Sequence, residues 1–493
     1  MAAAQTGSVF LQPLSVLIDL PVDQVNFVVC LGVALCAGPW FRLYLHPSHT
    51  SPNIRHIVAT ILGFYLAIFC FGWYTLHFVA YVSVSFALLH LVSAKHVHRY
   101  SMVVAIGYLS LCKMWVYISD YGVFSTDFTG PMMVMAQKIT SLAFEVHDGL
   151  GRKDEELSVD QQRLAVRQRP NLLQYLSYNF NFLSILAGPC CSYKDYVAFM
   201  EGWSCTAWAN PQGQSDSQPN GCQVWAEPSP MAVAFVKLAV AVASLGLHLT
   251  LGRAFPVLYN VDERFVRTGS FHARLCYLVV SIQAARPKYY FAWSLADAIH
   301  NAAGFGFNGY TKSGQPCWDL VSNINIWNIE TATSFKMFLD NWNTQTVRWL
   351  KFVCYDRLDK HATVATFLLS AAWHGVYPGY YFTFFTGILM SLAARVMRNN
   401  LRHHFLHSKV VKVLYDIVTW ATTHLAICYT VAPFVMFGMK PALDFYGSMY
   451  YCIHILTILI LLVLPIKPLR RIKPQACVDE FQGVGDRQGK KEQ

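Results

Sequence analysis

Long apolar blocks separated by short polar segments make up most of this chain. Several blocks reach the roughly 20 residues that an α-helix needs to cross a bilayer. Backbone amides in lipid must be bonded within their own segment, so these blocks are predicted to be helices. The short alternating segments of a transmembrane β-barrel are absent. The pattern predicts an all-α, polytopic integral membrane protein. The apolar blocks are residues 24–45, 57–94, 102–118, 175–187, 231–251, 275–293, 363–394, 411–437 and 449–466.

The block at 57–94 is long enough for two spans, with Gly72-Trp73-Tyr74 as the expected break. The whole set then amounts to about ten transmembrane helices. This divides the chain into an N-terminal segment (1–23), a membrane domain (24–466) and a basic tail (467–493). The segment 205–230 is rich in Pro, Gly, Ser and Asn and is expected to be a loop.

Composition supports a membrane protein and excludes a nucleic-acid binder. Hydrophobic residues make up 54% of the chain and charged residues 13%, whereas a soluble domain carries about 25% charged residues. The net charge is +10, but the basic residues form no single dense stripe of the kind that binds nucleic acid. They cluster in loops instead, as expected of segments that remain on the cytosolic side.

Charge also predicts topology and location. Lys467, Arg470 and Arg471 follow the last apolar block, so the C-terminus is expected in the cytosol. Lys490 and Lys491 stand fourth and third from the end, which resembles a dilysine retrieval signal of the endoplasmic reticulum. No basic residue precedes the first block, so that block is expected to be an uncleaved anchor.

His374 is the histidine whose context most favours chemistry. Six histidines lie at membrane depth, where an ionisable group is costly; most are expected to be neutral rings bonded to neighbouring helices. His374 differs because Pro378 follows and should kink the helix. Gly375 and Gly379 leave one face bare, so another helix or a substrate tail can approach closely.

Two further segments carry polar or aromatic groups. In the stretch 340–350, Asn343 can donate hydrogen bonds in a dry site without burying a charge; alternatively, Asn343 or Thr344 caps the following helix. The segment 286–293 and the Gly-Phe-Gly-Phe turn at 304–307 either line a pocket or form an aromatic belt at the membrane interface.

Other reaction classes lack their motifs. The sequence contains no GxSxG elbow, P-loop, HExxH or Cys/His metal spacing. Its 14 cysteines include no CxxC pair. What remains for chemistry is a histidine base, amide donors and an apolar interior.

Four segments together resemble the membrane-bound O-acyltransferase family, in its lysophospholipid branch. They occur in the order that the family shows and span nearly the whole chain. The histidine motif resembles the family signature most clearly. The four segments are Asn181 to Pro189, Pro287 to Trp293 with the turn at Gly304 to Phe307, Trp342-Asn343 with Thr346 and Trp349-Leu350, and Trp373 to Tyr380.

The resemblance implies a helical fold around a central reaction chamber, with residues 24–466 as the acyltransferase domain. The catalytic pair maps onto His374 and Asn343, with no metal and no covalent acyl-enzyme. Acyl-CoA enters from the cytosol as a co-substrate, not a cofactor, and the lysophospholipid enters from the membrane lipids. Oleoyl-CoA and a lysophosphatidylethanolamine or lysophosphatidylserine acceptor are the expected substrates. The substrate-binding residues that we expect are Trp342, Trp373, Tyr377, Lys288, Tyr289, Tyr290, Asn301, Gly304 and Gly306.

The proposed chemistry agrees with these residue types. Burial should lower the pKa of His374 from about 6.5, so that the neutral ring can take a proton from the glycerol hydroxyl. Asn343 either stabilises the oxyanion or positions substrate. The rival functions are acyl transfer to a sterol, diacylglycerol or protein, and membrane transport, for which no internal repeat is found. A membrane scaffold or receptor is a further alternative.

Overall fold

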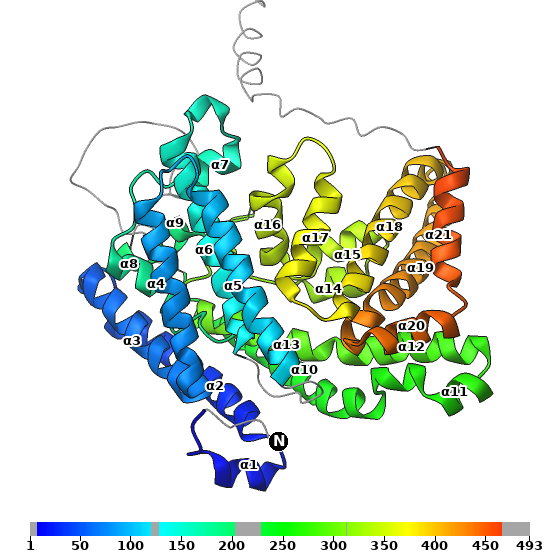
Figure 1. Cartoon of the computed structure of the whole chain (residues 1–493), viewed down its shortest axis with the longest axis horizontal. Coiled ribbons are helices and arrows are strands. Elements are labelled where there is room, and N and C mark those ends of the chain that lie inside the picture. Colours follow the sequence, from blue (N-terminus) through cyan, green and yellow to red (C-terminus); the bar gives the residue numbers. More distant parts are fainter. Residues whose placement is uncertain (1–6, 120–127, 203–227, 312, 466–493) are drawn as a thin grey trace, which may run out of the picture.

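The computed structural model describes residues 7–119, 128–202, 228–311 and 313–465 (Figure 1). Within these ranges the chain is helical and has no strand beyond two isolated bridges, Tyr310 with Pro316 and Ile324 with Trp342. The predicted all-α class is confirmed. The basic tail and most of the 205–230 segment lie outside the described residues.

The helices follow one another along the whole described chain, with short 3₁₀ turns between some of them. They are α1 (Gln12–Ile18), α2 (Val22–Tyr44), α3 (Pro52–Phe71), η1 (Gly72–Tyr74), α4 (Thr75–Leu91), α5 (Val97–Ser119), α6 (Thr129–Gly151), η2 (Asp154–Glu156), α7 (Val159–Leu164), α8 (Leu172–Phe180), α9 (Tyr193–Glu201), α10 (Met231–Ala254), η3 (Val257–Val261), α11 (Glu263–Thr268), α12 (Phe271–Ala285), α13 (Pro287–Ala302), α14 (Ile326–Glu330), α15 (Phe335–Asn341), α16 (Thr344–Val353), η4 (Tyr355–Arg357), α17 (Ala362–His374), α18 (Pro378–Leu401), η5 (Arg402–Phe405), α19 (Lys409–Met436), α20 (Met439–Ser448) and α21 (Cys452–Val463).

Fewer segments could cross a membrane than the ten or so that the apolar blocks predict. By length and composition the described residues hold six, and α20 with α21, bent by 72°, makes a seventh. The difference arises because several blocks fold as short or broken helices. The block at 275–293 is divided at Pro287 between α12 and α13, and the block at 363–394 is divided between α17 and α18. The six are Val22–Tyr44, Pro52–Leu91, Val97–Ser119, Met231–Val261, Pro378–Phe405 and Lys409–Met436.

The expected break at Gly72-Trp73-Tyr74 is confirmed. α3 ends at Phe71, η1 occupies the three residues, and α4 begins at Thr75. Gly72 has φ of +52°, a left-handed conformation that glycine adopts without steric cost.

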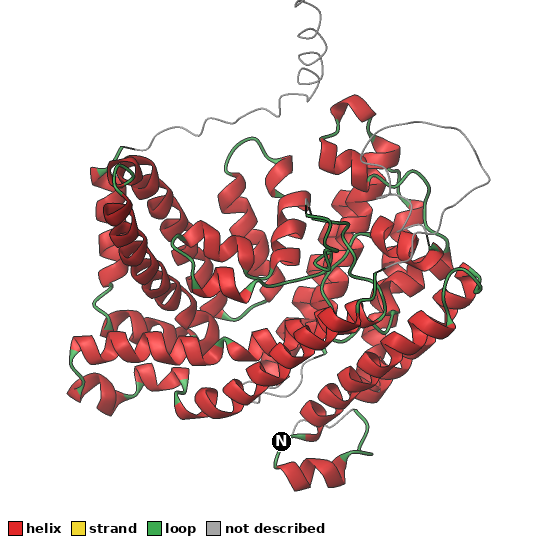
Figure 2. Ribbon diagram, turned by 180° about the vertical axis from the view of Figure 1, so that it is seen from behind, coloured by secondary structure: helices red, strands yellow, loops and turns green. Residues whose placement is uncertain are grey.

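The helices are arranged around α6, α16 and α17. In Figure 1, α10, α12 and α13 lie below α16 to α19, and α1 lies lower still. α3 to α6 stand on one side and α18, α19 and α21 on the other, with α16 and α17 between them; Figure 2 shows the same order from behind. The end of α17 and the start of α16 therefore lie inside the assembly.

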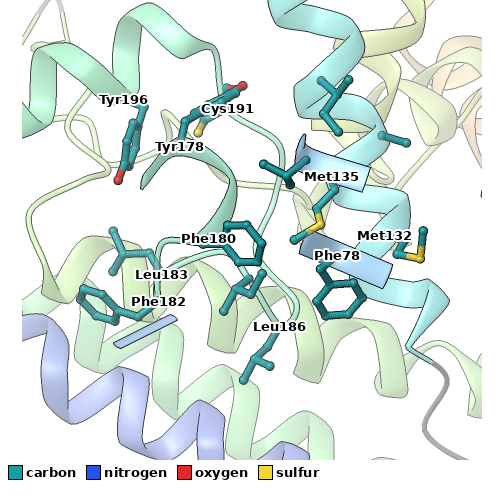
Figure 3. Packing of buried hydrophobic residues seen from close by; sticks show 14 of the residues in the cluster. Phe78, Met132, Met135, Tyr178, Phe180, Phe182, Leu183, Leu186, Cys191 and Tyr196 are labelled. Carbon is teal, nitrogen blue, oxygen red and sulfur yellow. The ribbon is translucent and has the colours of Figure 1, made fainter. Parts of the chain in front are cut away.

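The main apolar core surrounds α6. Figure 3 shows Met132 and Met135 of α6 beside Phe78 of α4 and near Phe180, at the end of α8. All four side chains belong to one buried cluster. Because α6 is buried along nearly its whole length, its polar side chains face other protein segments, and two of them contact the candidate site.

Candidate active site

His374 is the last residue of α17, at a break in the chain. Gly375 follows with φ of +117°, a conformation that side chains rarely adopt. A Cβ at Gly375 would lie 2.5 Å from the Cδ atom of Lys113. α18 then begins at Pro378, whose ring suits the first helical position. The predicted kink is thus a complete break, and it leaves the His374 ring at a helix end.

Aromatic rings surround His374. The ring centroids of Trp373, Phe434, Phe384 and Tyr380 lie 4.6, 5.0, 5.4 and 5.6 Å from the His374 centroid. Within the described residues, neither ring nitrogen of His374 has a hydrogen-bond partner, and the side chain is partly exposed. The ring is held by packing and remains available to exchange a proton.

Most other histidines at membrane depth are bonded, as expected of structural rings; His248, whose Nδ1 is buried without a partner among the described residues, is an exception. His454 contacts Thr386 Oγ1 at 3.0 Å and Tyr429 Oη at 2.8 Å, one with each ring nitrogen. His77 Nδ1 lies 2.9 Å from Tyr108 Oη. His374 therefore differs from these rings in its surroundings as well as in its sequence context.

Asn343 stands at the N-terminus of α16 in the left-handed conformation, with φ of 51° and ψ of 50°. Its backbone carbonyl accepts from Val347 N–H at 3.1 Å, but its side chain makes no capping bond. No other hydrogen bond to the Asn343 amide occurs in the described part of the chain. The position is that of a cap, as the alternative interpretation expects, yet the amide itself is unused.

Backbone bonds hold the chain on both sides of Asn343. Before it, Asn325 N–H donates to the Asn341 carbonyl at 3.1 Å. After it, Thr344 N–H donates to the Asn323 carbonyl at 2.9 Å. The segment that precedes α14 thus brackets Asn343 and fixes its unusual backbone conformation.

The two motifs meet through a pair of indoles. The ring centroids of Trp349 in α16 and Trp373 in α17 lie 5.6 Å apart. Trp349 Nε1 donates to Thr140 Oγ1, and Trp373 Nε1 donates to the Met133 carbonyl, both at 2.9 Å. Both acceptors belong to α6, which therefore joins the helix that follows Asn343 to the helix that ends at His374.

Helix geometry places Asn343 and His374 at the same end of the α16–α17 pair. Figure 1 shows the two helices side by side with their connection at the top. Trp349 contacts the residue next to His374 and lies six residues after Asn343, about 9 Å along the helix axis. The two residues of the predicted catalytic pair therefore lie at one end of two adjoining helices.

Trp342 lies in an aromatic cluster that α13 largely supplies. The centroids of Trp293, Tyr289 and Tyr290 lie 5.3, 5.6 and 6.0 Å from the Trp342 ring, and Phe338 stacks on it at 5.9 Å. The 286–293 segment is thus brought to the residue that precedes Asn343, as a pocket lining requires.

Lys288 and Tyr377 are two further residues that the sequence predicts to bind substrate. Lys288 is exposed at the start of α13, and in the described part of the chain it forms no ion pair. Tyr377 lies beyond the His374 break, with its ring centroid 5.0 Å from Tyr117 and 5.3 Å from Phe437. Trp373 and Tyr377 thus flank the break on opposite sides.

Asn301, Gly304 and Gly306 form the turn that ends α13. Gly304 has φ of +89°, and its N–H donates to the Asn301 carbonyl at 2.8 Å. Asn301 is fully buried, and its amide nitrogen lies 3.4 Å from Asp297 Oδ1. The contacts of these three residues are with the protein itself, so their substrate-binding role stays a prediction.

Cationic side chains near α16 divide into paired and free groups. Arg357 forms two bonds of 2.6 Å to the buried carboxylate of Asp148, and Lys336 is paired with Asp340. Arg348 and Lys360 are exposed and form no ion pair among the described residues. Arg348 Nη1 donates to the Leu320 carbonyl at 3.5 Å, so among the described residues both cations lack an anionic partner and could meet an anionic substrate.

The sequence motifs did not reveal that α6 makes hydrogen bonds to the helix that follows Asn343. Gln137 Nε2 donates to Thr346 Oγ1 at 2.8 Å, and Thr140 receives the Trp349 bond. The signal in the sequence is polar residues within a stretch of apolar ones, 131–146. Such residues usually face other helices rather than lipid.

Comparison with known proteins agrees with this arrangement. The profile of MBOAT, the membrane-bound O-acyltransferase family, matches residues 114–432, a range that contains Asn343 and His374. The chain is 57% identical to membrane-bound glycerophospholipid O-acyltransferase 2 of Gallus gallus, over 95% of this chain and 90% of that one. It is 56% identical to membrane-bound glycerophospholipid O-acyltransferase 1 of Mus musculus, over 94% of each chain.

A more distant relative extends the likeness. Lysophospholipid acyltransferase 6 of Drosophila melanogaster is 38% identical over 93% of this chain and 63% of its own length. The family profile thus spans the positions of both Asn343 and His374, and the relatives match more than nine tenths of this chain. This chain belongs to the membrane-bound O-acyltransferase family.

Proposed function

We propose that this protein transfers a fatty acyl group from acyl-CoA to the free hydroxyl of a lysophospholipid, with His374 as base and Asn343 as amide donor. One observation carries the assignment of the residues. His374 and Asn343 have unused polar side chains on two adjoining helices that α6 joins through Trp349 and Trp373. The names of the relatives, glycerophospholipid and lysophospholipid acyltransferases, support the substrate class.

The reaction needs one proton carrier and one oxyanion partner. His374 accepts the proton of the glycerol hydroxyl as its oxygen attacks the thioester carbonyl. The negative charge that develops on the carbonyl oxygen accepts a hydrogen bond from the Asn343 amide. The carbon–sulfur bond then breaks, and the proton on His374 passes to the departing CoA thiolate. An ester and free CoA result, and the His374 ring returns to its starting state.

The surroundings of each group suit its task. Packing among four aromatic rings limits the solvation of a charged imidazolium at His374 and so favours the neutral ring. The backbone bonds on both sides of Asn343 fix its backbone, and so the direction of its Cα–Cβ bond, before substrate arrives. A donor held in advance stabilises charge without reorganising during the reaction.

The finer substrate assignment follows from the resemblance. The expected donor is oleoyl-CoA, and the expected acceptor is lysophosphatidylethanolamine or lysophosphatidylserine. A central chamber between α6, α16 and α17 would receive the acyl-CoA from the cytosol and the lysophospholipid from the membrane. Lys288, Arg348 and Lys360 are the exposed cations available for phosphate groups.

An acyl-transfer assay tests the proposal. Membranes that contain the protein receive oleoyl-CoA and, separately, lysophospholipids with ethanolamine, serine, choline, inositol or glycerol headgroups. New diacyl phospholipid is expected with the ethanolamine or serine acceptor. A well-folded preparation that acylates none of them contradicts the proposal; a sterol, diacylglycerol and a protein acceptor are then the substrates to offer.

The location is a separate part of the proposal. A multi-pass protein of the endoplasmic reticulum with a cytosolic C-terminus would expose Lys490 and Lys491 to the retrieval machinery. Replacing both lysines by serine should move the protein to later compartments, as imaging with organelle markers would show. Unchanged location would mean that another segment supplies the address.

A further inference from the structure

A charged pair lies beside the segment that brackets Asn343. Lys237 Nζ of α10 is 2.8 Å from Asp297 Oδ2 of α13, and the two side chains are 21% and 9% exposed. Lys237 is the sole charged residue between positions 231 and 252 of an apolar span. A charge in such a span is costly and by default indicates a function.

The pair is tied to Ser322. The Ser322 hydroxyl donates to Asp297 Oδ2 at 2.6 Å, and Lys237 Nζ donates to Ser322 Oγ at 3.2 Å. Lys237 also donates to the Trp318 carbonyl at 2.6 Å. The three donors of one ammonium are thus divided among a carboxylate, a hydroxyl and a carbonyl, and two of these belong to one loop.

Ser322 in turn holds the start of α16. Thr344 Oγ1 donates to the Ser322 carbonyl at 2.7 Å, and Gln345 Nε2 donates to the same carbonyl at 3.1 Å. Thr344 and Gln345 directly follow Asn343. A continuous chain of hydrogen bonds therefore runs from Asp297 through a single residue, Ser322, to the helix end that carries the Asn343 amide.

Asn343 needs such support because its backbone is in the left-handed region. Asparagine enters this region more readily than most non-glycine residues but also adopts helical and extended conformations, so the surrounding bonds decide between them. A change in this backbone conformation would reorient the Cα–Cβ bond of Asn343 and hence move its amide. The bonds to Ser322 and Asn323 oppose that rotation.

We propose that Asp297 and Lys237 are positioning residues for Asn343, which act through Ser322 and touch no substrate. The inference rests on the proposed function, because it assumes that the Asn343 amide serves the reaction. The competing interpretation is an ion pair that contributes to the fold alone, since breaking a buried pair destabilises many proteins.

The end of α13 also contacts the Asp297 carboxylate. Asn301 Nδ2 lies 3.4 Å from Asp297 Oδ1, and a Cβ at Gly306 would lie 1.6 Å from Asn301 Oδ1. Any larger residue at Gly306 would push Asn301 against the carboxylate. The end of α13 is thus packed against the Asp297 carboxylate through Asn301.

The first test separates turnover from binding. Asp297→Asn keeps the shape of the side chain and removes its charge. We expect kcat to fall about tenfold, with the KM of acyl-CoA and of lysophospholipid changed less than about twofold, because positioning acts on the transition state. The kcat of Lys237→Arg, which keeps the charge, should be closer to that of the unaltered protein than the kcat of Lys237→Met. An unchanged kcat in Asp297→Asn would overturn the proposal.

The matched control removes a comparably buried hydrogen bond elsewhere. Asn260 is buried, and its Nδ2 donates to Ser281 Oγ at 2.9 Å. Asn260→Ala should lower thermal stability and leave kcat per folded molecule unchanged. If Asn260→Ala and Asp297→Asn lower kcat to the same degree, the effect of Asp297 is general destabilisation and the proposal is wrong.

The second test asks whether Asp297 acts through Asn343. In the Asn343→Ala background the amide is already gone, so adding Asp297→Asn should change the residual rate by less than about twofold, because residues that act as a unit are not additive. A further tenfold loss would contradict the proposal. A normal rate in Asn343→Ala alone would instead contradict the proposed function, which keeps the two failures distinct.

A third readout requires no activity. The Thr344 N–H is bonded to the Asn323 carbonyl, so hydrogen exchange of a peptide that spans 342–346 reports on this bond. Asp297→Asn and Ser322→Ala should speed exchange there, and Asn260→Ala should not. Exchange that rises equally in all peptides, or not at all near Asn343, would reduce the pair to a structural role.

Discussion

His374 and Asn343 are held in opposite ways. Four aromatic rings pack around His374, and within the described residues its ring forms no hydrogen bond. Asn343 lies between backbone hydrogen bonds on both sides of its position. A base must stay neutral until it takes a proton, and a donor must keep its direction; apolar packing serves the first need and a polar bracket serves the second.

The contrast also explains which residues tolerate change. Around His374, shape matters, because Gly375 and Gly379 stand where a side chain would collide with Lys113 and with the Pro433 carbonyl. Around Asn343, bonds matter, because the loop at 320–325 holds the chain there. Substitutions that alter volume should act on the first region, and those that remove hydrogen bonds on the second.

The largest effect is expected from loss of the base. His374→Ala should lower kcat by about a thousandfold, within the range that general bases contribute, as measured by acyl transfer in proteoliposomes. His454→Ala is the control, since both nitrogens of that ring are bonded to Thr386 and Tyr429. An active His374→Ala protein, or equal losses in both variants, would remove His374 as the base.

Loss of the Asn343 amide should lower kcat less than loss of the His374 base. Asn343→Ala is expected to lower kcat by about a hundredfold, the lower end of the effect of an oxyanion donor. The control is Asn341→Ala, because Asn341 already bonds to the Met337 carbonyl and to Asn328. If the Asn341 variant is the slower of the two, the amide donor is Asn341.

A volume change at the break should act on stability. A Cβ at Gly379 would lie 2.1 Å from the Pro433 carbonyl oxygen, so Gly379→Ala should cost about 2 kcal/mol through overpacking. Thermal unfolding in detergent measures the loss. Gly447→Ala, which meets no atom within 4 Å, should be neutral or stabilising. Equal stability of the two variants would mean that α18 and α19 separate freely at this point.

The smallest effect concerns pH and α6, outside the apolar spans. Burial, and then the nearby Asp195, raises the pKa of Glu145 to about 8. The pKa of Glu145 in the unfolded chain is about 4.3. The stability that depends on protonated Glu145 is therefore fully present below about pH 4.3 and is lost as the pH rises towards 8. The free energy of unfolding of Glu145→Gln, relative to that of the unaltered protein, should therefore rise by about 1 kcal/mol between pH 6 and 7. If the difference in free energy of unfolding between the two proteins does not change with pH, Glu145 ionises freely in the folded protein.

Sequence reasoning predicted the helical class and the break after His374 better than the number of spans. The Trp373 to Tyr380 segment identified both the break and its histidine, because proline and glycine act locally. The count of about ten spans was not confirmed, since several apolar blocks fold as short or broken helices. The bracket around Asn343 was beyond prediction, because it joins 318–325 to α10, α13 and α16, and such pairings depend on tertiary packing.

The most direct test of a single reaction site combines the two key substitutions. The His374→Ala/Asn343→Ala protein is compared with each single variant in acyl transfer from oleoyl-CoA, at equal amounts of folded protein. If base and amide act on one transition state, the double variant should be about as slow as His374→Ala alone, because removing one member already forfeits the contribution of the other. Losses that multiply to about 100,000-fold would contradict the account and place the two residues in separate steps.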